Sequence, residues 1–101
     1  MPDLSRITGF QWDQGNKDKN WIKHRVSNHE AEDVFFNRPL VLPNPKHSVK
    51  ERRYYALGET SQGRILFISF TIRQDLIRVI SARDANKKEK QKYYAQKKKH
   101  S

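Results

Sequence analysis

The stretch RILFISFTIRQDLIRVISARDAN, residues 64–86, decides the fold of this chain. Apolar and β-branched residues fill it on both sides of a polar break at residues 73–75. This pattern predicts two long antiparallel strands joined by a tight turn. The planar fork of arginine matches phosphate oxygens and keeps its charge, so a sheet that carries arginines is suited to bind phosphate. The stretch contains Arg64, Arg73, Arg78 and Arg83.

The two arginines of the second expected strand set a geometric condition. Arg78 and Arg83 are five residues apart, so on one regular strand their side chains would point to opposite faces of the sheet. We therefore expect them to converge only if the strand ends near Ser81 and Arg83 lies in the connection to a final helix.

Two helices are expected upstream of these strands. Asp13 is a candidate N-cap for a helix over residues 14–24. Ser27 and Glu30 have the spacing of a capping box, and apolar residues at helical spacing follow them. They predict a short amphipathic helix over Asn28–Phe36, which the next proline ends.

Shorter strands and a last helix complete the chain. Asn86 and Glu89 repeat the capping-box spacing and predict a helix through Gln96. The order of elements indicates an α+β fold: a four- to five-stranded antiparallel sheet with two N-terminal helices and a C-terminal helix, all on one face. The remaining strands are expected over residues 9–12, 40–42 and 51–59.

The length of 101 residues fits one domain. We expect a flexible N-terminus over residues 1–8, a folded domain over 9–96 and a basic tail over 97–101. No cysteine is present, which excludes disulfides and thiolate ligands. No apolar run is long enough to span a membrane, and residues 1–10 do not form a signal peptide, so the expected location is the cytoplasm.

The charge of the chain is strongly basic, with a formal net charge of +10. Residues 84–101 contribute seven lysines against Asp84 and Glu89. A surplus of this size favours a polyanionic partner, most often a nucleic acid, or an acidic protein. Solubility alone is the simpler interpretation.

No nucleotide-binding loop, metal-ligand cluster or serine-type triad can be assembled from the motifs, so we expect neither cofactor nor metal. Cleavage of RNA by its own 2′-hydroxyl needs a base, positive charge on the phosphate and an acid. The arginines supply the charge, and Glu51, beside Arg52 and Arg53, is the best-placed candidate base. The simpler interpretation is that Arg52 and Arg53 form a solvated strand face, and that Lys87–Lys99 form a solvated helix face.

Short motifs lie in a fixed order along residues 9–95. They are Phe10-x-Trp12-Asp13, Asn20-x-x-Lys23-His24, Val26-Ser27, Glu30-Ala31, Val34-Phe35, Glu51-Arg52-Arg53, Gly58, Gly63-Arg64, and Ile77-Arg78-x-Ile80-Ser81-Ala82-Arg83-x-Ala85 with Glu89 and Tyr93. In this order and spacing they resemble the BrnT toxin family.

The resemblance implies a type II toxin with a RelE-like fold: a small ribonuclease that stops translation without a metal. It also implies a co-encoded, BrnA-like antitoxin that neutralises the toxin and binds operator DNA. Carried over by position, the catalytic residues would be Glu51, as the base, with Arg53, Arg78 and Arg83. The residues expected to bind RNA are Arg52, Arg64, Arg73, Lys87, Lys88 and Tyr93. The sequence leaves the oligomeric state open, a dimer included.

The sequence departs from the family pattern in two places. Arg25 stands where the family usually has a glycine, at a helix end that favours positive φ. Phe36 and Asn37 replace acidic residues. The alternative to a ribonuclease is a non-catalytic nucleic-acid-binding protein or co-repressor derived from such a toxin. A third possibility is an interaction protein whose basic charge serves only an acidic partner.

Overall fold

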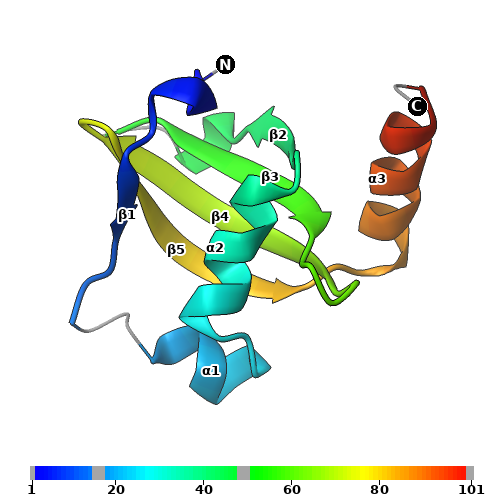
Figure 1. The fold of residues 1–101 in the computed structure, drawn as a ribbon, viewed down its shortest axis with the longest axis horizontal. Helices are drawn as coiled ribbons and strands as arrows, with labels where there is room; N and C mark the ends of the chain where they lie inside the picture. Colours follow the sequence, from blue (N-terminus) through cyan, green and yellow to red (C-terminus); the bar gives the residue numbers. More distant parts are fainter. Residues whose placement is uncertain (1, 15–17, 48–50, 100–101) are drawn as a thin grey trace.

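The computed structural model describes residues 2–14, 18–47 and 51–99, which form a five-stranded sheet with helices packed on it (Figure 1). The α-helices are α1 (Lys19–His24), α2 (Asn28–Phe36) and α3 (Lys87–Lys99), and short 3-10 helices cover Leu4–Arg6 and Pro45–His47. The strands are β1 (Gly9–Gln11), β2 (Leu40–Pro43), β3 (Arg53–Glu59), β4 (Ile65–Arg73) and β5 (Leu76–Asp84). Strands and α-helices follow one another in the predicted order.

The prediction of an antiparallel sheet is wrong at one edge. The strand order is β1-β5-β4-β3-β2, and β1 pairs with β5 in parallel, with Phe10 opposite Ile77. The chain crosses the sheet through α1 and α2 before it reaches β2 at the far edge. The first strand is thus placed beside the last one without a hairpin that would make the pair antiparallel, so the sheet is mixed.

A β-bulge in β5 changes which side chains share a face. Phe70 pairs with Val79, but the preceding Ser69 pairs with Ser81, so Ile80 is the extra residue. The bulge corrects for the odd spacing of the two arginines: Arg78 lies opposite Thr71 and Arg83 opposite Phe67, on one face. The expectation that they converge only if the strand ends near Ser81 is therefore wrong, because β5 continues to Asp84.

Helix α2 covers one face of the sheet, which we call the α2 face. Its Ala31 and Val34 are fully buried in a cluster with Ile68 and Phe70 of β4. A Cβ atom on Gly58 of β3 would lie 2.9 Å from Val34 Cγ1, so the small glycine allows the helix and the strand to approach closely.

Helix α3 packs on the opposite face, not on the α2 face with the other helices as expected. Tyr93 is 5% exposed and packs with Leu57, Ile65 and Ala85. Leu57 and Ile65 alternate with residues that point to α2, and so belong to the other face. Because Tyr93 is the one strongly buried residue within the described part of α3, the helix covers only one end of this face.

The helix boundaries follow their caps. Helix α2 matches its predicted bounds, and both bonds of its capping box, between Ser27 and Glu30, are 3.0 Å long. Helix α1 is shorter than predicted within the described residues, because it begins at Lys19. The Asp13 carboxylate, expected to cap this helix, forms an ion pair with Arg78 instead. Residues 15–17 of the predicted helix lie outside the described ranges. Helix α3 continues three residues past the predicted end.

Gly63 and Arg25 both have positive φ, and for Arg25 this confirms the prediction from the sequence. Gly63, in the turn before β4, has a φ of +87°. Arg25 follows α1 in the left-handed region with a φ of 54°, which is where the family pattern has glycine. Over the described ranges, no helix is both long and apolar enough to cross a membrane.

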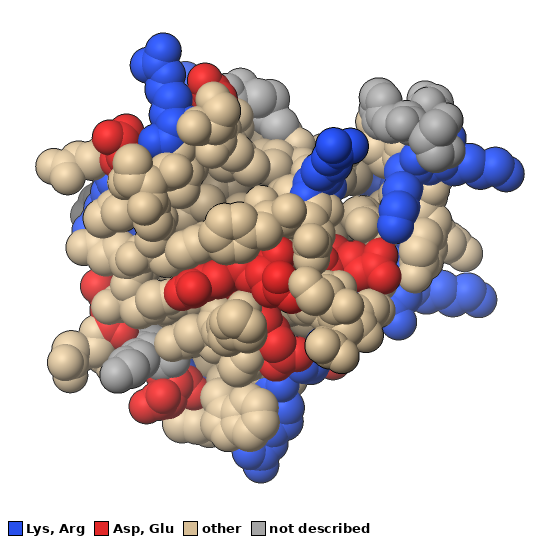
Figure 2. Space-filling model, viewed as in Figure 1, with Lys and Arg blue, Asp and Glu red and all other residues tan. Residues whose placement is uncertain are grey.

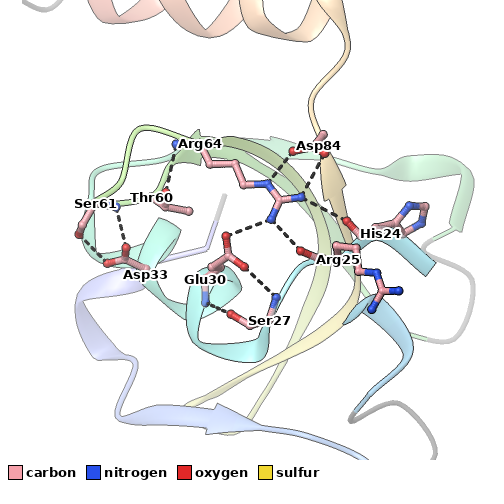
Figure 3. Close-up of polar contacts among 9 residues, drawn as sticks. All are labelled: His24, Arg25, Ser27, Glu30, Asp33, Thr60, Ser61, Arg64 and Asp84. Carbon is pink, nitrogen blue, oxygen red and sulfur yellow. Dashed lines mark hydrogen bonds and ion pairs between the residues drawn. The ribbon is translucent and has the colours of Figure 1, made fainter. Parts of the chain in front are cut away.

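Arg64 connects three separate elements of the fold (Figure 3). Its guanidinium donates to the Asp84 carboxylate at 2.7 and 3.1 Å and to the Glu30 carboxylate at 3.0 Å. It also donates to the carbonyl oxygens of Arg25 at 2.8 Å and His24 at 3.2 Å. These five contacts use all five N–H groups of the side chain. Arg64 thereby joins the ends of α1 and β5 to the start of α2.

The carboxylates around Arg64 are stabilised in their charged form. The hydrogen bond from Arg64 lowers the pKa of Asp84 against the effect of burial. For Glu30, burial raises the pKa, but hydrogen bonds from Ser27 and Arg64 outweigh it and the net pKa is lowered. Both groups therefore add stability above their ordinary pKa values of 3.8 and 4.5, and this stability is lost as the pH falls through the lowered folded values.

We predict that Arg64→Lys destabilises the protein although it keeps the charge. An ammonium group has three donors on one atom and cannot reach four partners on three elements. Losing two or more of these bonds should lower the free energy of unfolding by roughly 2 kcal/mol. This corresponds to a fall in Tm of about 10 °C, which circular dichroism can measure. An unchanged Tm would contradict the structural role of the Arg64 fork.

The pH dependence gives a second readout of the same contacts. Between pH 7 and pH 3 the free energy of unfolding of the wild type should fall, because protonation of Glu30 and Asp84 removes bonds to Arg64. In Arg64→Lys this fall should be smaller, since part of the stabilisation is already absent. Equal acid sensitivity of the two proteins would show that Arg64 does not lower these pKa values.

Candidate phosphate-binding face

The sheet face opposite α2, beyond the end that α3 covers, brings together side chains from three neighbouring strands. We call this region the open face. Strand alternation and register place on it Arg53, Tyr55, Ser69, Thr71, Arg78, Ser81 and Arg83. Three of the four residues expected to be catalytic are therefore neighbours on one surface.

A row of hydroxyl groups crosses the middle of the open face. Tyr55 pairs with Ser69, and Ser69 pairs with Ser81. All three residues are half-buried. Because serine side chains are short, the surface of the sheet is recessed at this point. The sequence gives no signal for the two serines, whereas the spacing of Tyr55, two residues after Arg53, indicates a shared face.

Cationic side chains flank this row on both sides along the strands. On one side, Arg53 and Arg78 lie in the row of Thr71. On the other side, Arg83 lies in the row of Phe67. Each flanking row is about 7 Å from the hydroxyl row, which is two residues along a strand. A phosphate above the two serines would thus lie between guanidinium groups that approach it from two directions.

Arg83 has the best-defined surroundings of the three arginines. Its two terminal nitrogens donate to the Glu89 carboxylate, at 2.9 Å each, and Nη1 also donates to the Asp84 carbonyl at 3.1 Å. Its guanidinium lies 4.5 Å from the centre of the Phe67 ring. The bonds to Glu89 raise the pKa of Arg83, so its charge is permanent.

Arg78 is held by a carboxylate in a similar way. It forms an ion pair with Asp13, which follows β1, and its side chain is 19% exposed. The parallel pairing of β1 places Gln11 beside Arg78 and so brings Asp13 to this face. Asp13, expected to cap a helix, instead orients an arginine of the open face.

Glu51, the expected base, lies away from Arg83. Its carboxylate accepts a hydrogen bond of 3.2 Å from Arg73, at the end of β4. Arg73 is six residues along β4 from Phe67, the partner of Arg83, which corresponds to roughly 20 Å of strand. The structure pairs Glu51 with Arg73 and does not bring it near Arg83.

The other residues expected to bind RNA are dispersed. Arg64 precedes β4 on the α2 side, where Glu30 and Asp84 hold it. Tyr93 is buried between α3 and the sheet, and this burial raises its pKa. Its ring therefore has no exposed face for stacking on a base. The remaining three, Arg52 before β3 and Lys87 and Lys88 in the first turn of α3, are exposed, as is Arg73 at the end of β4.

Acidic side chains gather on the α2 face. Figure 2 shows acidic side chains across its centre, over α2 and towards α3, with basic ones around the margin. Helix α2 contributes Glu30, Glu32 and Asp33. Such a surface repels phosphate, so the open face is the better candidate for an RNA site.

In the described part of the chain, no group of three or more His, Asp or Glu side chains is placed to hold a metal ion.

Comparison with known proteins adds information on the family. No curated protein matches this chain. It is similar to the 1.1 Å crystal structure of the Brucella abortus ribonuclease toxin BrnT, with 24% identity and a TM-score of 0.62 over 80% of this chain and 100% of that chain. At this identity the likeness shows the fold.

The family is given by a sequence model. The model described as "Ribonuclease toxin, BrnT, of type II toxin-antitoxin system" matches residues 12–89, from Trp12 to the Glu89 that holds Arg83. This range includes the bulged strand and all three arginines of the open face. The chain therefore belongs to the BrnT family of ribonuclease toxins of type II toxin–antitoxin systems.

Proposed function

We propose that this protein cleaves RNA on its open face, with the reacting phosphate above Ser69 and Ser81 and between Arg53, Arg78 and Arg83. The observation that carries the proposal is the bulge at Ile80, which aligns Arg78 and Arg83 on one face beside Arg53. Membership of a family of ribonuclease toxins supports the reaction class.

The proposed reaction uses the 2′-hydroxyl of RNA as the nucleophile. Its oxygen forms a bond to the adjacent phosphorus, the bond from phosphorus to the 5′-oxygen breaks, and a cyclic phosphate and a 5′-hydroxyl result. One proton leaves the 2′-hydroxyl and one reaches the 5′-oxygen. Negative charge grows on the phosphate oxygens in the transition state, and the three arginines stabilise it there. We propose that these arginines, and not a metal ion, supply the positive charge.

The position of Glu51 limits its role. Its carboxylate is paired with Arg73, which lies four residues from Ser69, roughly 13 Å along β4. A base for a hydroxyl above the serines must come within hydrogen-bonding distance. We therefore propose that Glu51 holds Arg73 at the rim, and that positioning and charge account for most of the rate enhancement.

Helix α3 would attract the substrate. Between Lys87 and Lys99 it carries seven lysines and one glutamate, Glu89. Lysine side chains that neutralise RNA phosphates release counterions, so binding should weaken steeply as the salt concentration rises. Lys87 and Lys88 lie closest in sequence to Arg83 and would contact the RNA backbone next to the cleaved bond.

The family also implies an antitoxin partner. We propose that cleavage arrests translation in the cytoplasm, and that a co-encoded, BrnA-like antitoxin neutralises the toxin and binds operator DNA. The basic surface of the chain is suited to an acidic segment of such a partner.

A second candidate function is RNA binding without cleavage. It is favoured by the ion pairs of Arg78 with Asp13 and of Arg83 with Glu89, which reduce the net charge of the open face. A binding protein of this kind would show the same salt dependence but would leave RNA intact. The co-repressor alternative belongs to this class.

We predict that induction of the wild type arrests growth and degrades RNA, and that Arg83→Ala does neither. Loss of one guanidinium from the phosphate site should lower the cleavage rate of purified protein on an RNA oligonucleotide by about 100-fold or more. Arg6→Ala, which removes an equal charge at an exposed site, should stay active. Melting curves will show whether Arg83→Ala is folded.

The outcomes separate the two candidate functions. Intact RNA with every variant, combined with salt-dependent binding, would replace the ribonuclease by the binding protein. Full activity of a folded Arg83→Ala would move the site away from the open face.

A further inference from the structure

We propose that Glu89 is a positioning residue for Arg83: it fixes the guanidinium on the open face and directs the free edge of the fork towards the RNA phosphate. This proposal rests on the proposed ribonuclease function. Glu89 lies on α3, outside the sheet that carries the arginines, and its side chain is 17% exposed.

The contact between the two side chains is a bidentate fork. Arg83 Nη1 donates to Glu89 Oε1 and Nη2 donates to Oε2, both at 2.9 Å. A fork of this kind sets the plane of the guanidinium as well as its distance. The plane is also supported by the Phe67 ring, which lies 4.5 Å away, and by the Asp84 carbonyl that accepts from Nη1.

The contact with Glu89 leaves two N–H donors of Arg83 available to a ligand. The guanidinium has five N–H groups, and three of them donate to Glu89 and Asp84. The Nε hydrogen and the second Nη2 hydrogen have no acceptor among the described residues. These two donors lie on one edge of the fork, which is the arrangement that grips two phosphate oxygens.

Glu89 itself is held in place by the start of α3. The Asn86 N–H donates to Glu89 Oε1 at 2.9 Å, and the Glu89 N–H donates to Asn86 Oδ1 at 2.8 Å. This is the reciprocal capping box that the sequence predicts, and here its carboxylate has a second role. Burial raises the pKa of Glu89, but the bonds from Arg83 and Asn86 outweigh it, so the carboxylate stays charged.

The opposite interpretation is that Glu89 occupies the phosphate site and inhibits the enzyme. A phosphate would then have to displace a carboxylate that accepts three hydrogen bonds, two from Arg83 and one from Asn86. The free edge of Arg83 offers a phosphate two donors without this cost. The geometry therefore favours positioning over competition.

The test compares Glu89→Gln with two controls in cleavage of an RNA oligonucleotide. The introduced amide is close in shape to the carboxylate and can keep the cap, but its NH₂ group cannot accept from Arg83 Nη2. We expect kcat to fall at least tenfold while KM does not rise, since the freed charge of Arg83 still attracts RNA. A kcat that is unchanged or higher would overturn the proposal, and a higher value would identify Glu89 as a competitor.

The controls separate positioning from the stability of α3. Glu59→Gln removes a second ion pair of this helix, with Lys97 at 3.4 Å, and Asn86→Ala removes the side-chain half of the cap. Both should leave kcat within about twofold of the wild type, and Asn86→Ala should lower the Tm. If Asn86→Ala lowers kcat as much as Glu89→Gln, the effect comes from the helix and not from the fork.

A spectroscopic readout keeps the proposal independent of the ribonuclease function. The Arg83 Nε–H signal in a ¹⁵N spectrum should be sharp in the wild type and in Glu59→Gln, and broadened by exchange in Glu89→Gln. If the wild type cleaves no RNA, the proposed function fails, while a sharp signal that depends on Glu89 still supports positioning. A signal that is the same in all three proteins would refute it.

Discussion

The extra residue in β5 is the constraint on which the open face depends. Without the bulge at Ile80, Arg83 would point into the α2 face and Ala82, which is fully buried, would point away from it. The bulged part of β5 lies beyond the three residues that pair with β1, so its outer edge lacks a strand partner. Asn20 of α1 fills this position, since its Oδ1 accepts from the Ala82 N–H at 3.0 Å. A motif residue of the first helix thus supports the strand that carries the arginines.

The arginines of the decisive stretch divide into two groups by the face on which they lie. Arg64 is on the α2 side, and its N–H groups hold α1, α2 and β5 together. Arg78 and Arg83 are on the open face, where one carboxylate orients each of them. Residue type alone does not distinguish a structural arginine from one that is available to a ligand. The distinction comes from the number of guanidinium N–H groups that have no acceptor within the protein.

Local signals predicted local structure well. The capping box at Ser27 and Glu30 predicted the start of α2, and Pro39 predicted its end. The polar break around Gln74 predicted the turn between the long strands. The parallel β1, the bulge and the contacts of Arg64 could not be predicted in this way. Each depends on residues far apart in sequence, such as His24 and Arg64, which periodicity does not relate. Of the expected catalytic residues, the three arginines lie together, and Glu51, chosen for its neighbours in sequence, does not lie near Arg83.

The most direct test of the central claim is a titration of the arginine Nε–H signals with a 2′-deoxy oligonucleotide, which binds as RNA does but lacks the attacking hydroxyl. If the open face binds the phosphate, the signals of Arg53, Arg78 and Arg83 will shift together with one dissociation constant, and the signal of Arg64 will not move. A shift of Arg64, or separate titrations of Arg78 and Arg83, would contradict the assignment of these arginines to a single phosphate site.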